Sequence, residues 1–519
     1  MQHFTKTITL RDRILNKKNN LEMNQKDIKT LGELKKAKYQ SISIKEEIRN
    51  NLLYKIKNNQ ERFTGILGYE HTVLRDTETA ILSRHNILFL GLRGQAKTKI
   101  ARQMVDLLDE YVPVIKGSEI NDDPLNPISK FALNLIEKEG DNTPIEWLHR
   151  SERYGEKLAT PDVSVADLIG DIDPIKAANL KLSFSDEQVI HYGIIPRCNR
   201  SIFVINELPD LQARIQVALF NILQEGDIQI RGFKLRMPLD ILFVFTANPE
   251  DYTNRGSIVT PLKDRIESQI LTHYPKDLET ALRITEQEAR ILPDQLKQLK
   301  IADILKRIVE QLAFEARSSE YVDKKSGVSA RLSISALENL ISSAERRAIL
   351  NKEKDSQVWI SDLSGIIPAI TGKIELVYEG EQEGPYQVAL HLLEKAIRTQ
   401  FLRYFPTPSK RTPTGKTSQE AKEQNPYKKI IQWFDQGNII DIFVEMKDTE
   451  RIENLYKVDG LYGLVKKQYP QANEKENALL MEFVLHGLSA HSLISKKTIE
   501  GQIRFNDLIG SMMNFSDDE

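Results

Sequence analysis

The chain has 519 residues, of which 40% are hydrophobic and 28% charged, and a formal net charge of −2 at pH 7. This length is too great for one hydrophobic core, so roughly two to four domains are expected, and the near-neutral charge gives no reason to expect a nucleic-acid-binding protein. No apolar run approaches the roughly 18 residues of a membrane helix, and the N-terminal segment lacks the apolar stretch of a secretory signal. Cys198 is the only cysteine, which excludes an intrachain disulfide and favours a reducing compartment, most simply the cytoplasm.

Residues 1–62 form a segment rich in Lys, Asn and Gln. Its first 60 residues hold 14 Lys/Arg and 6 Asp/Glu, a net charge of +8. The pattern predicts a basic, helical and partly mobile N-terminal extension. Either a solvated arm or a docking arm for an acidic partner accounts for it.

Residues 63–275 alternate short apolar runs with amphipathic helical patterns. Buried parallel strands have this appearance when helices cover both faces of a sheet. The segment therefore predicts an α/β domain. Its apolar runs are Ile87–Leu90, Ser201–Ile205 and Ile241–Thr246, and two further strands, Ile228–Arg231 and Lys234–Met237, predict a hairpin before the third run.

The remainder of the chain reads as helical, with one interruption. Residues 276–404 predict a helical domain, and residues 427–519 a further helical region that ends in an acidic tail. Between them, residues 405–426 contain four prolines and many small polar residues, so they predict a flexible linker.

The first apolar run is followed by a candidate phosphate-binding loop, Gly91-Leu-Arg-Gly-Gln-Ala-Lys97-Thr98. In such a loop successive backbone N–H groups face one point, and the next helix adds its positive N-terminal end. Lys97 would neutralise β/γ-phosphate charge, and Thr98 would ligate Mg²⁺. The usual spacing places glycine where this chain has Ala96. If that position needs a positive φ, alanine costs about 1 kcal/mol or more. Taken alone, the loop fits a plain strand–turn–helix equally well.

Polar side chains also follow the second and third apolar runs. Asn206 and Glu207 come after the second run, and Asn248 follows the third. Ligands of open parallel sheets bind at the carboxyl ends of the strands. Glu207 is a candidate general base for an attacking water. Asn206 offers a neutral oxygen where a magnesium-binding carboxylate is usual, and Asn248 can hydrogen-bond the γ-phosphate or the water.

The ordered set of motifs resembles the AAA+ ATPases, and in particular the branch that contains the magnesium-chelatase ATPase subunit and MoxR-type proteins. The stretches that carry the resemblance to this branch are Ile66–Ile81, Asp167–Ala177 and Gly193–Leu211. The second of these resembles a place where an extra hairpin interrupts a helix. The resemblance covers about residues 63–350 and implies a P-loop parallel sheet with helices on both faces, followed by a helical lid at 276–404.

The resemblance also implies roles for individual residues. ATP would bind to the phosphate loop, at Gly91, Arg93, Gly94, Gln95, Ala96, Lys97, Thr98 and Lys99. Thr98 and Asn206 would serve Mg²⁺, Glu207 would be the catalytic base, and Asn248 the polar sensor. Arg265 matches an arginine finger that one subunit gives to its neighbour's nucleotide, and Arg331 a lid arginine that reaches the γ-phosphate. For Arg265 a surface pair with Asp264 is the alternative, and for Arg331 a surface position near a helix start.

The implied function is an ATP hydrolase, slowed by Ala96 and Asn206, which assembles as a homo-oligomer, a hexameric ring in the family. It would remodel or mature a partner protein with a von Willebrand A-type domain. Two alternatives stay open: a nucleotide-gated scaffold with little hydrolysis, and the ATPase subunit of magnesium chelation in porphyrin synthesis. A nucleic-acid motor has only the basic N-terminal segment in its favour, and no membrane insertion is expected.

Overall fold

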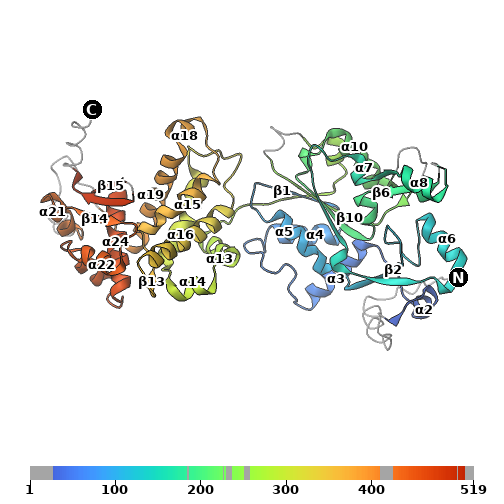
Figure 1. Cartoon of the computed structure of the whole chain (residues 1–519), viewed down its shortest axis with the longest axis horizontal. Helices are drawn as coiled ribbons and strands as arrows, with labels where there is room; N and C mark the ends of the chain where they lie inside the picture. The colour runs from blue at the N-terminus through green and yellow to red at the C-terminus, as the bar shows by residue number, and fades with distance from the viewer. Residues whose placement is uncertain are drawn as a thin grey trace, which may run out of the picture. The chain divides into compact units, whose positions relative to one another are not determined.

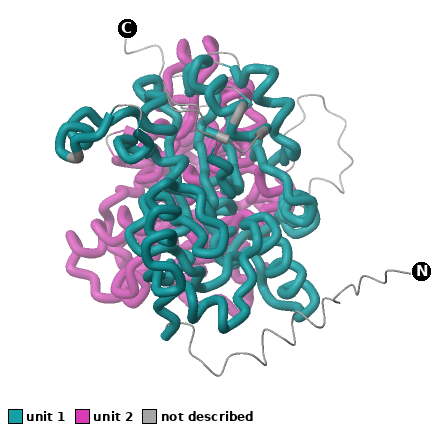
Figure 2. The backbone as a smooth tube through the Cα atoms, turned by 90° about the vertical axis from the view of Figure 1, so that its right-hand side faces the viewer, with its two compact units in different colours: residues 1–91, 96–273 teal, residues 92–95, 274–519 magenta. Residues whose placement is uncertain are grey.

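The computed structural model describes residues 27–183, 186–225, 227–228, 237–249, 257–408, 425–499 and 501–508. The chain divides into two compact units (Figure 2). Unit 1 comprises residues 1–91 and 96–273, and unit 2 comprises residues 92–95 and 274–519. The boundary near residue 273 lies close to the end of the predicted α/β domain.

Unit 1 is an α/β unit built on a five-stranded parallel sheet (Figure 1). Its strands lie in the order β11-β1-β10-β7-β4, and each neighbouring pair is parallel. The sheet strands are β1 (Ile87–Leu90), β4 (Tyr154–Leu158), β7 (Ser201–Asn206), β10 (Ile241–Ala247) and β11 (Ser268–Leu271). The helices are α2 (Leu31–Lys36), α3 (Ile44–Lys57), α4 (Val73–Leu82), α5 (Lys97–Gln103), α6 (Lys130–Glu139), α7 (Val165–Leu168), α8 (Pro174–Leu180), α9 (Ile194–Arg197), α10 (Ala213–Glu225) and α12 (Thr260–Lys263).

Alternate residues of the central strands pack against two different helical layers. On one face, Val204 and Val244 join a core with α3, α4 and α5. On the other face, Phe203 and Phe245 join a core with α10, which lies across the strands from α4 and α5 (Figure 1). Strands covered on both faces are apolar throughout, and this explains why the three apolar runs were recognisable. The predicted α/β architecture, a parallel sheet with helices on both faces, is confirmed.

Short antiparallel hairpins decorate this sheet. Strands β2 (Tyr111–Ile115) and β3 (Ile145–His149) form one. A second, β5 (Gly170–Ile172) with β6 (Ile190–Tyr192), stands between α7 and α9, in the region where the resemblance implied an inserted hairpin. The hairpin predicted before the third run is present at its base, where β8 (Asp227–Ile228) pairs with β9 (Met237–Pro238). Its predicted turn lies outside the described residues.

The N-terminal segment differs from the expected extension. Helix α3 begins after Ser43, whose side chain accepts a hydrogen bond from the Glu46 backbone N–H. Its apolar face, including Ile48 and Leu52, is buried in the same core as β1 and β10. Residues 44–57 are therefore part of unit 1. Residues 1–26 lie outside the described residues.

Unit 2 is mainly helical. Its helices are α13 (Leu278–Glu288), α14 (Pro293–Gln298), α15 (Asp303–Ser318), α16 (Arg331–Leu350), α17 (Ile367–Thr371), α18 (Tyr378–Glu383), α19 (Pro385–Tyr404), α21 (Lys428–Asp435), α22 (Asp448–Tyr456), α23 (Leu461–Gln468) and α24 (Glu474–Ala490). Strands β12 (Leu299–Lys300) and β13 (Ser356–Gln357) pair in parallel. An antiparallel sheet of β14 (Ile440–Phe443), β16 (Gln502–Asn506) and β15 (Ser495–Ile499) was not expected from the sequence.

Residues 276–404, the expected lid, share one core with the described part of the C-terminal region, although the sequence suggested two separate regions. Phe401 of α19 packs against Phe483 of α24, with 5.6 Å between ring centroids and an interplanar angle of 51°. Gly487 permits this approach, because a Cβ there would lie 2.0 Å from the Phe401 ring. Buried Arg347 of α16 binds Asp362 and also Asp448 of α22, at 3.1 and 2.9 Å. Residues 276–404 and 427–508 thus fold as one unit.

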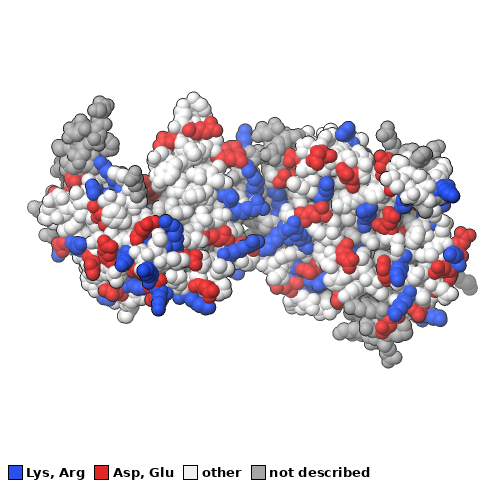
Figure 3. Space-filling view, in the orientation of Figure 1, with Lys and Arg blue, Asp and Glu red and all other residues white. Residues whose placement is uncertain are grey.

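Within the ranges that the structure describes, no helix is long and apolar enough to cross a membrane. The chain has 72 Lys/Arg and 74 Asp/Glu, and the two kinds of side chain are interspersed over much of the face in Figure 3.

Candidate functional site

The loop between β1 and α5 has a backbone shape that suits glycine. The Gly91 N–H donates to the Ala247 carbonyl at 3.2 Å, which fixes the loop's start against β10. Two later positions have positive φ: 72° at Gly94 and 56° at Ala96. Ala96 has a ψ of 14° and lies in the left-handed region, a conformation that glycine adopts without steric cost. Helix α5 begins at the next residue, Lys97.

Lys97 points from α5 towards the end of β10. Its Nζ donates to the Asn248 side-chain oxygen at 2.6 Å and also contacts the Gly91 carbonyl. Asn248 is 8% exposed and follows directly after β10. The structure therefore brings together the ammonium group and the amide that the sequence predicted would meet at a phosphate.

Thr98 faces Asn206 at the end of β7. The Thr98 hydroxyl donates to the Asn206 Oδ1 at 3.2 Å, and the hydroxyl of Thr246 donates to the same oxygen at 3.1 Å. Thr246 also accepts a hydrogen bond from the Glu207 backbone N–H at 3.1 Å. Three neighbouring strands thus bring polar groups to one edge of the sheet. Strands β10 and β7 do so at their own ends, and β1 does so through the loop and helix α5 that follow it.

Glu207 has an unusual backbone. Its φ is 55° and its ψ 47°, which is the left-handed region. A non-glycine residue in that region costs about 1–3 kcal/mol and is typical of functional sites. The side chain is half-buried.

A carboxylate that the sequence analysis did not identify adjoins Asn206. Glu156 of β4 accepts a hydrogen bond from the Asn206 Nδ2 at 2.6 Å. Arg102 binds the same carboxylate with Nε at 2.9 Å and Nη2 at 3.0 Å, and the Tyr154 hydroxyl donates to it at 2.9 Å. Burial acts to raise the pKa of Glu156, but these hydrogen bonds outweigh it and hold that pKa below its usual value. Glu156 is therefore ionised at neutral pH.

The oxygen atoms at this edge fit a magnesium ion. Mg²⁺ prefers oxygen ligands and keeps several waters in proteins. The Thr98 hydroxyl and the Asn206 amide oxygen lie 3.2 Å apart, and both are neutral oxygen donors. These two residues would hold the ion, together with water and phosphate oxygens.

Other loop residues predicted to bind the nucleotide have partners elsewhere. Within unit 2, Arg93 forms an ion pair with Glu375, and Gln95 is buried. Within unit 1, the Lys99 Nζ donates to the Gly65 carbonyl at 3.3 Å. The Lys99 side chain therefore contacts the segment that precedes α4 in this structure.

The two arginines predicted for catalysis lie in different units. In unit 1, Arg265 donates to the Gln224 side chain of α10 at 2.9 and 2.7 Å and stands 5.2 Å from the centre of the Phe220 ring. The Asp264 pair considered as the alternative is not its contact. In unit 2, Arg331 is the first residue of α16 and its side chain is exposed.

Three contributors to this edge were missed: Thr246, Arg102 and Glu156. Thr246 lies two residues before the predicted Asn248, and Arg102 lies one helical turn after Thr98, so sequence spacing could have indicated both. Glu156 gave no signal because its strand was not recognised.

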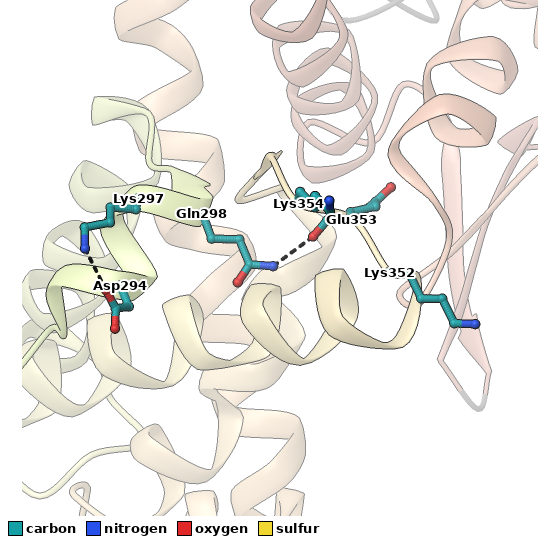
Figure 4. A pocket seen from close by; sticks show the side chains of 6 residues that line it. All are labelled: Asp294, Lys297, Gln298, Lys352, Glu353 and Lys354. Carbon is teal, nitrogen blue, oxygen red and sulfur yellow. Dashed lines mark hydrogen bonds and ion pairs between the residues drawn. The ribbon is translucent and has the colours of Figure 1, made fainter.

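A surface pocket in unit 2 is a weaker candidate site (Figure 4). Within it, Lys297 pairs with Asp294 at 2.8 Å, and both side chains are largely in solvent. None of the predicted site residues lines it. Its lining residues are Asp294, Lys297, Gln298, Lys352, Glu353 and Lys354.

No protein-family model matches the chain, and no curated protein matches it. Among solved structures, it is similar to a model of the complex between subunits BchI and BchD of magnesium chelatase, with 18% identity, 62% of this chain and 98% of that chain covered, and a TM-score of 0.33. It is also similar to a mutant of RuvB from Thermotoga maritima, with 11% identity, coverage of 66% and 80%, and a TM-score of 0.33. A third similar structure is NtrX from Brucella abortus in complex with ADP, with 13% identity, 71% of this chain and 67% of that chain covered, and a TM-score of 0.33.

Proposed function

We propose that this AAA+ chain, of the chelatase/MoxR type, binds ATP with Mg²⁺ at the carboxyl edge of the unit 1 sheet and hydrolyses it. One observation carries the proposal: Lys97 meets Asn248 at 2.6 Å while Thr98 meets Asn206 at 3.2 Å. An ammonium group, a hydroxyl and two amides at a helix N-terminus form a site for a polyphosphate with its metal ion.

The residues have distinct roles in this proposal. Lys97 neutralises phosphate charge, and Asn248 holds both that ammonium group and the terminal phosphate or the attacking water. Thr98 and Asn206 hold Mg²⁺, which supplies charge neutralisation on the phosphate oxygens when bound. Glu207 accepts a proton from the attacking water. Its left-handed backbone aims the residue away from the strand direction that β7 would otherwise continue.

Calorimetric titration with ATP and ADP tests the binding step. Lys97→Ala should weaken ATP binding by more than about tenfold, because it removes the ammonium group that contacts Asn248. Lys116→Ala, which removes an exposed lysine after β2, serves as the matched control and should bind as the wild type does. Wild-type protein that ignores both nucleotides would refute the proposal.

Steady-state hydrolysis separates an ATPase from a nucleotide-gated scaffold. The scaffold is favoured by one observation, the amide of Asn206 in place of a carboxylate. Glu207→Gln should keep ATP affinity and lower the hydrolysis rate by about 10²-fold or more. Equal, near-zero rates for wild type and Glu207→Gln at high protein concentration would favour the scaffold.

We further propose that hydrolysis requires self-assembly, with Arg265 as the finger offered to a neighbouring subunit. Arg265 lies at the surface and is held by Gln224, so it is presented in a defined position. Arg265→Ala should retain ATP binding and lose about 10³-fold or more in hydrolysis, whereas Lys263→Ala, at an exposed neighbour, should not. Hydrolysis per subunit that is independent of protein concentration would contradict this proposal.

The partner protein is proposed to carry a von Willebrand A-type domain, as the chelatase/MoxR resemblance implies. The interaction should depend on nucleotide, because it is the ATP-driven change that would remodel the partner. Binding of a purified A-domain protein, compared with ATP, with ADP and without nucleotide, checks this. Equal binding in all three conditions would separate the interaction from the ATPase.

A further inference from the structure

We infer that Glu156 is a positioning residue that fixes the Asn206 amide with its oxygen towards Thr98, which allows an asparagine to serve beside Mg²⁺. The inference rests on the proposed function of unit 1 as a MgATP site. The contact that carries it is the hydrogen bond of 2.6 Å from the Asn206 Nδ2 to the Glu156 carboxylate.

An amide beside a cation has an orientation problem that a carboxylate lacks. One end of the group is an oxygen that attracts Mg²⁺, and the other is an NH₂ donor that repels it. Rotation of the Asn206 amide by half a turn would exchange the two. A neighbour that only accepts hydrogen bonds on the NH₂ side, and neighbours that donate on the oxygen side, together exclude the wrong orientation.

The structure supplies both kinds of neighbour. The Glu156 carboxylate accepts from the NH₂ group, whereas the hydroxyls of Thr98 and Thr246 donate to the oxygen at 3.2 and 3.1 Å. Asn206 is 8% exposed, so water cannot readily replace these partners. Partners of this kind set the orientation of metal ligands.

Glu156 is itself held in place. Arg102 binds it with two nitrogens, in the paired geometry that fixes both position and orientation. Tyr154, two residues earlier on β4, donates a third hydrogen bond. The carboxylate is therefore fixed before any ligand arrives, and it fixes the amide in turn.

The same contact explains why position 206 does not carry an aspartate. A carboxylate there would bring a second anionic oxygen to the place now 2.6 Å from Glu156. Two carboxylates at such a distance repel each other strongly. Asparagine at 206 and glutamate at 156 are thus a matched pair. The double variant Asn206→Asp/Glu156→Gln exchanges the amide and the carboxylate. It would restore the hydrogen bond with the donor at residue 156 and the acceptor at residue 206.

Thermal unfolding without nucleotide provides the first test. Asn206→Asp alone should lower the melting temperature by several degrees, and the double variant Asn206→Asp/Glu156→Gln should recover most of this loss. The matched control is the double variant Asn206→Asp/Glu146→Gln, whose second change lies at an exposed position on β3. This control should not recover the lost melting temperature. An Asn206→Asp variant as stable as the wild type, or a double variant no better than the single one, would overturn the inference.

The effect of Mg²⁺ on ADP affinity provides the second test. The measured quantity is the ratio of the ADP dissociation constants in EDTA and in Mg²⁺. Glu156→Ala should lower this ratio about 10- to 100-fold with little change of affinity in EDTA, which also shows that the variant is folded. Glu156→Gln should keep most of the ratio, because its side-chain oxygen still accepts the amide's hydrogen bond. An unchanged ratio in Glu156→Ala would overturn the inference.

The two tests separate failure of the inference from failure of the proposed function. Wild-type protein that binds no ADP would refute the nucleotide site. The unfolding experiment would still report whether residues 156 and 206 act as a pair.

Discussion

Ala96→Gly tests whether the phosphate loop is strained. Ala96 has a φ of 56° in the structure, and the left-handed conformation costs an L-residue about 1–2 kcal/mol. Glycine removes that cost. Two effects of the substitution lower the stability. The loss of a half-buried methyl group beside the α3–α5 core costs less than about 0.8 kcal/mol. The greater conformational freedom of glycine in the unfolded chain costs about 0.4–1 kcal/mol. At mid-range these three contributions leave a net stabilisation of about 0.4 kcal/mol.

Ala218→Gly is the matched control for this change. Ala218 is also half-buried and lies in unit 1, but within the regular helix α10. Glycine there should destabilise the protein by about 1 kcal/mol through helix propensity, in addition to the lost methyl contact. Calorimetric unfolding of the full chain should therefore shift the unit 1 transition in opposite directions, or at least separate the two variants by about 1–2 kcal/mol.

Equal destabilisation by Ala96→Gly and Ala218→Gly would refute the reasoning, because it would mean that residue 96 does not hold a positive φ in solution. The nucleotide affinity of Ala96→Gly should remain close to that of the wild type. On the proposed function the loop keeps this shape when nucleotide binds, so the strain would be equal in the free and bound states and would cancel from the affinity. A large gain in affinity would show instead that alanine prevents the loop from closing on phosphate.

Two predictions concern unit 2. Arg347→Ala should cost about 3–5 kcal/mol of unfolding free energy, because it leaves the fully buried Asp362 without the Arg347 guanidinium. Arg346→Ala, which removes an exposed arginine, should cost at most about 1 kcal/mol. Comparable losses for the two variants in urea denaturation would contradict this reasoning. Burial holds the pKa of His486 well below 6.5, so the folded state binds fewer protons than the unfolded state, and stability should be lost as the pH falls below about 6.5, by up to about 1.4 kcal/mol per pH unit. His486→Phe should lessen this acid sensitivity while His391→Gln, at an exposed position, should not, and an unchanged pH profile in His486→Phe would exclude His486 as the cause.

The central strands could be predicted because both faces of the sheet are covered. The predicted runs that start at Ile87, Ser201 and Ile241 begin at the same residues as β1, β7 and β10. Since the carboxyl ends of parallel strands share one edge, the sequence also indicated which polar side chains would lie together. The contacts of Lys97 with Asn248 and of Thr98 with Asn206 follow from that rule.

The edge strand β4 could not be predicted in the same way. Its sequence, Tyr-Gly-Glu-Lys-Leu, has no apolar run, because only part of the strand packs in the core. Gly155 is required by a close neighbour, since a Cβ there would lie 2.2 Å from the Cys198 sulfur. Glu156 is polar because it binds Arg102 and Asn206. These are long-range contacts that sequence periodicity does not report.

The boundaries of unit 2 were also beyond local sequence patterns. The proline-rich residues 405–426 indicated a division between two regions. The packing of Phe401 against Phe483 joins those regions across that segment, and only the folded chain brings them together. Short strands with lysine and polar residues, such as β15 (Ser495–Ile499), likewise gave no clear strand pattern.

The common core of unit 2 has a mechanical consequence. Close-packed interiors transmit displacement rather than absorb it. The buried ion pair of Arg347 with Asp448 links α16 to α22, and movement of one helix past the other would separate these two buried charges. When the helix that begins with Arg331 turns, the small antiparallel sheet at the far end of the chain must turn with it. Unit 2 would therefore move as one rigid body, and a label placed on β15 would report a rotation that begins at α16.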